Sequence, residues 1–347
     1  ASASRDRHNG DRNEYSSTGY DVTLSYRLFD GKRRASRDIA GFNLETQREE
    51  LRKNLLELDY RVKVAFYTAV AGREVLEQRK IQLEDARKDH EVAEGRRSLG
   101  AARLSEVLQA SVRLEQARFN VVQAEGNLRK ALSELYSLIG RPDETEGSTE
   151  GSLDASGAVP ELKPLSEAVL GRPEIRQAEI AREKAESSRS LARSDFYPTV
   201  SANLSYGRSD AATFGNQALE DRSAGVTAAW NLFELGKFYR TKSARIEVSI
   251  SEENIRELKR QLLLDCRKGW EDLVTAVRNE TVAAEQLRRA EQNYEQAFGE
   301  YKVGKGDILS LVQAESLLAN AREQLTTARM NAVLARALLE KIAGAGK

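Results

Sequence analysis

The sequence has few of the residues from which functional sites are usually built. It contains one cysteine, Cys266, and two histidines, His8 and His90, among 347 residues. A single cysteine excludes an intrachain disulfide, and two histidines form no metal cluster unless the fold brings them together. We expect His8 in a loop, His90 on a helix surface and Cys266 packed as a small thiol. No glycine-rich phosphate loop, zinc-ligand spacing or nucleophile elbow is present either, so we predict no enzymatic activity, no cofactor and no metal site.

Long hydrophobic runs and net charge are missing as well. The sequence has no stretch of about 20 apolar residues, so it predicts no transmembrane helix. Lys plus Arg and Asp plus Glu both number 54, so the formal net charge is zero. The chain has no excess of positive charge that would indicate nucleic acid as a partner. Only five prolines accompany 31 % charged and 40 % hydrophobic residues, a composition typical of long solvated helices or coiled coils.

The two halves of the chain repeat each other at a constant offset of 204 residues. LSYRLFDGKRR (24–34) resembles AAWNLFELGKFYR (228–240), and LGAARLSEVLQASVRLEQAR (99–118) resembles VGKGDILSLVQAESLLANAR (303–322). The equivalent pairs are Phe29 and Phe233, Gly100 and Gly304, Gln109 and Gln313, Ala117 and Ala321, Asn127 and Asn331, and Gly140 and Gly344. A duplication is therefore indicated, and each half predicts a strand, a long helix, a tight turn and a second helix.

The predicted long helices cover residues 33–97 and 239–302, and neither contains proline. About 65 helical residues span roughly 100 Å, so we expect a coiled-coil rod or tunnel wall. The return helices, 103–139 and 307–343, carry alanine at every seventh position, which predicts a seam of small side chains. These alanines are Ala110, Ala117, Ala124 and Ala131 in the first copy, and Ala314, Ala321, Ala328 and Ala335 in the second. An ordinary antiparallel coiled-coil hairpin is the alternative.

Three short segments alternate apolar and polar residues and predict strands with two different faces. They are residues 20–28, 198–207 and 224–233, each about as long as a tilted strand that crosses a bilayer. A soluble sheet would alternate in the same way, but the helices already use their apolar stripes on one another. We therefore expect the apolar faces to meet lipid, with Tyr26, Tyr206 and Trp230 at the membrane interface; plain sheet packing is the alternative for these aromatics.

The polar segment 208–223 between two predicted strands indicates an extracellular loop. The second half has a helix and a strand before this loop, whereas the first half begins inside the matching loop. We therefore expect one helix and one strand to precede residue 1, giving four strands per protomer. Four strands cannot close a barrel of useful bore, so several protomers would share one.

The expected division of the chain follows from these elements. It consists of an extracellular loop and barrel strand (1–30), a first periplasmic helical hairpin (31–142), a linker (143–164), a periplasmic helix (165–197), a barrel hairpin with its extracellular loop (198–233), and a second periplasmic hairpin (234–347).

The ordered set of motifs resembles the outer-membrane factor family, the TolC-type channels of tripartite efflux pumps and type I secretion. The motifs are SYRLFDGKRR and WNLFELGKF from strand to helix, LARSDFYPTVSANLSYG from helix to strand, and the turns LGAARLSEVLQA and VGKGDILSLVQA. The resemblance covers nearly the whole chain. It implies a passive exit duct in the outer membrane of a Gram-negative bacterium. The duct would be a homotrimer with a 12-stranded β-barrel in outer-membrane lipid and a periplasmic α-barrel. A periplasmic adaptor (membrane fusion) protein and an inner-membrane transporter would be its partners.

The two helix–helix turns are the expected functional positions, because glycine tolerates the left-handed backbone of a sharp reversal. The resemblance implies that these turns form the periplasmic entrance, which closes like an iris and meets the hairpins of the adaptor. The predicted docking residues are Leu99, Gly100, Ala101, Ala102, Val303, Gly304, Lys305 and Gly306.

The resemblance also implies a gate at this entrance. Tyr301 matches the family tyrosine, and Glu106 matches an acidic partner on the other turn. Ser310 and Gln313 occupy the positions of the family's acidic rings, so the carboxylates are not reproduced there. Asp307, one turn away, either replaces them or caps the return helix, and the two roles can coexist. We interpret the basic run at 96–100 as a solvated helix end.

A second hypothesis is a soluble structural coiled-coil scaffold whose strands form a small packed sheet. Partition of the expressed chain into the outer membrane distinguishes the two hypotheses. The cargo (a drug, a metal ion or a protein) has no signature in the sequence.

Overall fold

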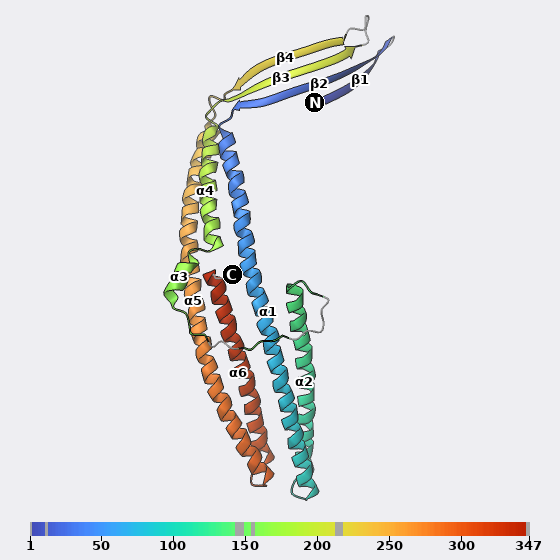
Figure 1. Ribbon diagram of the computed structural model, residues 1–347, viewed down its shortest axis with the longest axis vertical. Helices are drawn as coiled ribbons and strands as arrows, with labels where there is room; N and C mark the ends of the chain where they lie inside the picture. The colour runs from blue at the N-terminus through green and yellow to red at the C-terminus, as the bar shows by residue number, and fades with distance from the viewer. Residues whose placement is uncertain (1, 11–12, 143–148, 154–156, 212–217, 345–347) are drawn as a thin grey trace. The chain divides into compact units, whose positions relative to one another are not determined.

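The structure is a computed structural model that describes residues 2–10, 13–142, 149–153, 157–211 and 218–344 (Figure 1). Its elements are β1 (Ser2–Gly10), β2 (Asn13–Phe29), α1 (Lys32–Ser98), α2 (Leu104–Leu138), α3 (Leu162–Val169), α4 (Pro173–Ser194), β3 (Thr199–Ala211), β4 (Ala218–Ala229), α5 (Leu235–Lys302) and α6 (Ile308–Ala343). The fold is mainly long helices with a small antiparallel sheet, as predicted. Among the helices in the described ranges, none has an apolar stretch long enough to span a bilayer.

The chain divides into two compact units, and the first comprises residues 1–50 and 176–257. Its strands form one antiparallel sheet in the order β1-β2-β3-β4 (Figure 1). The register places apolar residues opposite one another, since Leu24 faces Leu204 and Leu204 faces Ala224. The next position along each strand is polar, and there the Ser205 and Ser223 hydroxyl oxygens lie 2.6 Å apart. This pairing confirms the alternation predicted for the strands.

The apolar face of the sheet is open. Leu24 is 64 % exposed and Val226 is 69 % exposed, and Val22, Tyr26 and Leu204 are exposed as well. Side chains of this kind are usually covered in a soluble sheet, because one face packs on a core. Among the described residues of this unit, the helices therefore leave this face uncovered.

Two details of the sheet correct the sequence predictions. Residues 2–10 form β1 where an extracellular loop with His8 was expected, because they pair with β2 from Ser2 opposite Asp21 to Gly10 opposite Asn13. Their polar sequence carries no alternation that would have predicted a strand. The strands also extend into the expected loop 208–223, up to Ala211 and again from Ala218; the rest of that loop lies outside the described residues.

Strand β4 ends earlier than predicted, at its C-terminal end. It ends at Ala229, so Trp230 and Leu232 lie after the strand rather than on its apolar face. The indole Nε1 of Trp230 donates a hydrogen bond to the Phe196 carbonyl oxygen at 3.1 Å. This bond holds Trp230 in the connection between strand and helix and explains why the alternation in the sequence overran the strand.

The predicted helix 165–197 is two helices in the structure. Helix α3 begins at Leu162, inside the predicted linker, and ends at Val169, while α4 begins at Pro173. Gly171 and Pro173 explain the break, because glycine favours a helix end and proline is tolerated only in the first turn of a helix.

The second unit comprises residues 51–175 and 258–347 and contains α2, α6 and the parts of α1 and α5 that form helical hairpins with them. The predicted alanine seams are confirmed. The buried members are Ala110, Ala117, Ala124, Ala314, Ala321 and Ala328, and Ala131 and Ala335 are partly buried. Small side chains at this spacing let the two helices of each hairpin approach closely.

Polar pairs link the two hairpins along their length. Lys63 Nζ of α1 lies 2.9 Å from Glu340 Oε2 of α6, and the Arg79 guanidinium lies 3.0 Å from Glu323. A core cluster that includes Val70, Ala332 and the linker residue Leu153 lies between them. Cys266 is fully buried beside Leu262, and burial raises the pKa of its thiol, as expected for a packed cysteine.

Candidate functional site

The two turns that join the long helices have the same backbone geometry. Gly100 has φ 73° and Gly304 has φ 75°, both in the left-handed region. In each turn the residue after the glycine donates its N–H to a carbonyl five residues earlier, which closes the helix end. These bonds join Ala101 N to Arg96 O at 2.8 Å and Lys305 N to Glu300 O at 2.9 Å. The duplication seen in the sequence is thus repeated in the backbone.

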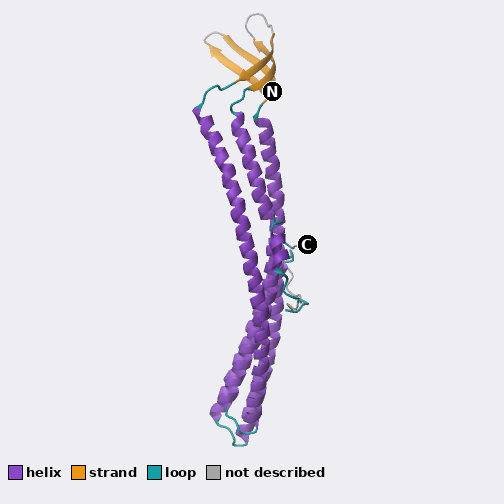
Figure 2. Cartoon of the chain, turned by 90° about the vertical axis from the view of Figure 1, so that its left-hand side faces the viewer, coloured by secondary structure: helices purple, strands orange, loops and turns teal. Residues whose placement is uncertain are grey.

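Both turns lie at the same end of the second unit (Figures 1 and 2). Leu99 is 85 % exposed and Val303, its equivalent in the repeat, is 67 % exposed. Ala101 and Lys305 are exposed, whereas Ala102 and Gly306 are partly buried. The end of the unit therefore presents two large apolar side chains beside small residues and the exposed Lys305.

Gly306 is needed for close packing within its turn. A Cβ atom at this position would lie 3.1 Å from the Cβ of Glu300 and 3.2 Å from the Tyr301 nitrogen. A larger residue would push the start of α6 away from the end of α5.

Arg96 connects the two turns. Its guanidinium lies over the ring of Tyr301, 4.4 Å from the centroid. Arg96 Nη1 donates to the Tyr301 carbonyl oxygen at 2.9 Å, and Nη2 donates to the Ala101 carbonyl oxygen at 3.3 Å. One side chain from α1 thereby binds the end of α5 and the α1–α2 turn. The interpretation of residue 96 as part of a solvated helix end was wrong.

Tyr301 is fully buried. Burial raises the pKa of its hydroxyl, and the nearby Arg96 charge opposes that rise. The hydroxyl oxygen has no hydrogen-bond partner in the part of the chain that the structure describes. Its ring, and not its hydroxyl, therefore makes the contact between the hairpins.

Glu106 does not bind Tyr301 within this chain. Its Oε1 accepts a hydrogen bond from the Arg103 N–H at 3.2 Å, and its own N–H donates to the Arg103 carbonyl oxygen at 3.1 Å. The side chain satisfies a free N–H at the start of α2, as the glutamate of a capping box does.

Asp307 caps α6. Its Oδ1 accepts a hydrogen bond from the Ser310 N–H at 2.8 Å, and the hydrogen bonds with Ser310 hold the pKa of its carboxyl below the usual range. The side chains of Asp307, Ser310 and Gln313 are all exposed. The capping role proposed from the sequence is confirmed, and the carboxylate remains accessible to solvent.

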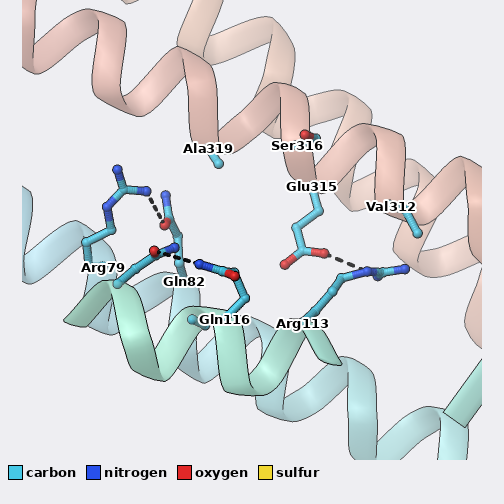
Figure 3. Close-up of a pocket in the computed structure, with 10 residues that line it drawn as sticks. Arg79, Gln82, Arg113, Gln116, Val312, Glu315, Ser316 and Ala319 are labelled. Atoms are coloured by element: carbon cyan, nitrogen blue, oxygen red, sulfur yellow. Dashed lines mark hydrogen bonds and ion pairs between the residues drawn. The ribbon is translucent and has the colours of Figure 1, made fainter. Parts of the chain in front are cut away.

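A groove with several polar side chains runs between the hairpins farther along the unit (Figure 3). It is lined by Arg79 and Gln82 of α1, Arg113 and Gln116 of α2, and Glu315 of α6, among others. The Arg113 guanidinium points at Glu315, 3.4 Å from its Oε2. Among the described residues, no group of three or more His, Cys, Asp or Glu side chains is placed to hold a metal ion.

Comparison with known proteins decides the family. The sequence matches the family described as "Outer membrane efflux protein" over residues 1–141 and 165–345. The chain belongs to the outer membrane efflux protein family. The resemblance to TolC-type channels is thereby confirmed.

Two curated proteins are similar in sequence. Protein CyaE of Bordetella pertussis is 27 % identical over 316 residues, which cover 87 % of this chain and 65 % of CyaE. The pyoverdine export outer membrane protein OpmQ of Pseudomonas aeruginosa is 25 % identical over 291 residues, covering 81 % of this chain and 60 % of OpmQ. The chain thus spans slightly less than two thirds of the length of these relatives.

A solved channel shares the fold. The CmeC outer membrane channel of Campylobacter jejuni superposes with a TM-score of 0.82 over 99 % of this chain and 77 % of CmeC, at 17 % sequence identity. This likeness supports the TolC-like fold of the outer membrane efflux protein family for the described chain.

Arg96 is the residue at this site that sequence reasoning missed. The signal was present in the repeat: Arg96 lies four residues before Gly100, and Tyr301 lies three residues before Gly304. Equivalent helix ends lie side by side in a duplicated hairpin pair, so residues near equivalent glycines could have been expected to meet.

Proposed function

We propose that the protein is a passive exit duct of a tripartite efflux pump or type I secretion system in the outer membrane of a Gram-negative bacterium. It would act with a periplasmic adaptor protein and an inner-membrane transporter. No bond is made or broken in this function. The duct provides an aqueous path, and the transporter selects the cargo.

The open apolar face of the sheet carries the proposal. Leu24, Leu204 and Val226 lie on one face, and none of them is covered by the chain's helices. Lipid would cover this face, while the row containing Thr23, Ser205 and Ser223 would face water. Four antiparallel strands cannot close a useful barrel by themselves. Three copies would supply the 12 strands of one barrel.

A second exposed apolar surface supports a homotrimer. Helix α2 carries an exposed stripe of Leu104, Leu108, Val112, Phe119 and Val122. Val112 and Phe119 each lie two residues after a buried alanine, which is about 200° around the helix. The stripe therefore points away from the chain's own seam. Another copy of the chain would bury it, which would also close the helices into a tunnel.

The two turns would form the entrance of this tunnel. Leu99 and Val303 would insert between the hairpin tips of the adaptor, and Gly100, Ala101, Ala102, Gly304, Lys305 and Gly306 would permit close approach. Tyr301, Glu106, Asp307, Ser310 and Gln313 would set its width and polarity. Three exposed Asp307 carboxylates in one ring would attract cations.

Membrane fractionation, oligomer analysis and conductance together test this function. We expect the chain, expressed with an export signal, to partition into the outer membrane, to need detergent for extraction, and to cross-link as a trimer. In planar bilayers it should give discrete single-channel steps. A monomer that stays dispersed in buffer without detergent would overturn the proposal and favour the scaffold.

Cross-linking to an adaptor tests the docking role of the two turns. Leu99→Ser with Val303→Ser should abolish cross-linking to an adaptor and leave the trimer intact. The matched control is Leu44→Ser, which changes an exposed leucine in the other unit. Loss of adaptor cross-linking in the control as well would remove the docking assignment.

A further inference from the structure

The end of the second unit contains a buried carboxylate that none of the functions above uses. Asp89 of α1 is only 2 % exposed. Neither of its oxygens has a hydrogen-bond partner of normal geometry among the described residues. A buried charge without a partner is costly, and a carboxyl group in this position commonly takes up a proton instead.

Titratable groups from four helices surround Asp89. Asp85 precedes it by one turn on α1, Tyr294 faces it from α5, and Glu315 faces it from α6. The positive charges nearby are already engaged. Arg113 of α2 pairs with Glu315 at 3.4 Å, and Arg322 of α6 pairs with Asp85 at 3.5 Å.

This environment favours the neutral form. Burial raises the pKa of Asp89 to about 7, and the charges of Glu315 and Asp85 add to the rise. Arg113 and the nearby Tyr294 hydroxyl oppose it. Burial also raises the pKa of Glu315 and that of Tyr294. Asp89 is therefore a buried carboxyl whose proton is exchanged near neutral pH.

The position of Asp89 connects it to the turns. It lies seven residues, or about two helical turns, before Arg96 on α1. Tyr294 likewise lies seven residues before Tyr301 on α5. The same two helices thus meet at two levels, first at Asp89 and Tyr294 and then, nearer the turns, at Arg96 and Tyr301.

We propose that Asp89 is a protonation site that controls how tightly the α1–α2 hairpin packs against the α5–α6 hairpin. With a neutral Asp89 the hairpins close, and with an ionised Asp89 the repulsion from Glu315 of the α5–α6 hairpin favours their separation. This inference goes beyond the exit duct, because it concerns the packing of one protomer. In a duct it would make the entrance open more readily as the pH rises.

The direction and the pH range follow from proton linkage. The closed form binds the Asp89 proton more tightly than an open, hydrated form, in which the carboxyl would titrate near its ordinary value. Opening therefore becomes more favourable as the pH rises, by at most about tenfold per pH unit. The increase levels off above the pKa of the closed form, near pH 7.

Hydrogen exchange of the purified full chain, followed by mass spectrometry, tests the inference. The readout is the protection factor of peptides from α1 (residues 84–95) and α5 (residues 289–300), with rates corrected to the intrinsic rate at each pH. We expect protection to fall at least tenfold between pH 5 and pH 7 and to change little from pH 7 to pH 8. In Asp89→Asn, which keeps the shape of the neutral acid, protection should stay high and flat.

Three further variants separate Asp89 from its neighbours. Glu84→Gln removes an exposed carboxylate of the same helix and should keep the wild-type response. His90→Gln should also keep it, which excludes the adjacent histidine as the source of the response. Glu315→Gln removes a repelling charge and should weaken the response without abolishing it.

Each remaining outcome overturns the inference. Protection in the wild type that is constant from pH 5 to pH 8 contradicts it. So does a wild-type slope retained by Asp89→Asn, or a response abolished by Glu315→Gln or His90→Gln alone. Exchange is measured without reference to conductance or membrane partition, so failure here is distinct from failure of the exit-duct proposal.

Discussion

The Arg96 guanidinium lies over the ring of Tyr301 with its central carbon 4.4 Å from the ring centroid, and it also donates a hydrogen bond to the Tyr301 carbonyl oxygen. Arg96 thus contacts both the ring and the carbonyl oxygen of Tyr301, and it also donates a hydrogen bond to Ala101. These contacts connect the two turns through one side chain. A cation over a desolvated ring contributes about 2 kcal/mol, and a hydrogen bond from a charged donor contributes about 1.5–3 kcal/mol.

Replacement of Arg96 should therefore loosen the entrance. We expect Arg96→Ala to raise single-channel conductance and to lower hydrogen-exchange protection at residues 299–305. Arg96→Lys should give an intermediate result, because an ammonium keeps the charge but cannot bind two carbonyls while stacking on the ring. Arg97→Ala is the matched control, since Arg97 is the exposed neighbour. Equal effects of the two alanine variants would show that only net charge matters.

The Tyr301 hydroxyl should be dispensable. It is buried without a hydrogen-bond partner, so Tyr301→Phe removes an unsatisfied polar group and keeps the ring under Arg96. We expect the thermal unfolding midpoint to stay constant or rise, by the equivalent of about 1 kcal/mol. A clear fall would reveal a bond to this hydroxyl in the assembled protein.

Adding Glu106→Ala to Tyr301→Phe should have a different effect. This change removes the bond to the Arg103 N–H and should fray the first turn of α2, at a cost of about 0.5–2 kcal/mol. The double variant should conduct more than wild type, and most of the increase should come from Glu106→Ala alone. An unchanged conductance would discard both residues as gate elements and leave the channel proposal intact.

Alanine substitutions at two pairs of glycines should have opposite effects. Gly100→Ala and Gly304→Ala place a Cβ at φ 73° and 75°, which should cost about 1–2 kcal/mol each. Gly95→Ala and Gly299→Ala lie inside helices with no atom within 4 Å of the added Cβ, so each should gain roughly 0.5–1 kcal/mol. Thermal unfolding of the four variants measures both signs. Equal shifts at all four sites would contradict the left-handed assignment.

The cap at Asp307 should fail in acid. Because the folded-state pKa of this carboxyl lies below its ordinary value, its contribution is complete above the ordinary value and is lost as the pH falls through the lowered one. Asp307→Ala should lower the unfolding midpoint at pH 6 but have little effect at pH 2. Asp307→Asn keeps a capping side chain without the charge, so its deficit at pH 6 should be smaller than that of Asp307→Ala, with the same dependence on pH because both variants remove the titrating carboxyl. A deficit of Asp307→Ala that is the same at both pH values would contradict this account.

The sequence by itself determined the elements and the repeat. Gly100 and Gly304 mark the reversals because left-handed backbone favours glycine. The alanine seam from Ala110 to Ala124 follows from a seven-residue period, which can be recognised in the sequence without knowing which helix packs against it. The same holds for the strand around Leu24, where the alternation of side chains is a local property of extended backbone. These features depend on neighbours in the sequence, and so a single sequence reveals them.

Tertiary structure decided what depends on partners far away along the chain. Strand β1 forms because β2 pairs with it, although its own residues carry no alternation, and Trp230 leaves the strand because the Phe196 carbonyl accepts its N–H. The contact of Arg96 with Tyr301 and the burial of Asp89 join residues about 205 positions apart. Spacing along one helix cannot specify which face of another helix it meets, because that choice is made by packing of the whole unit.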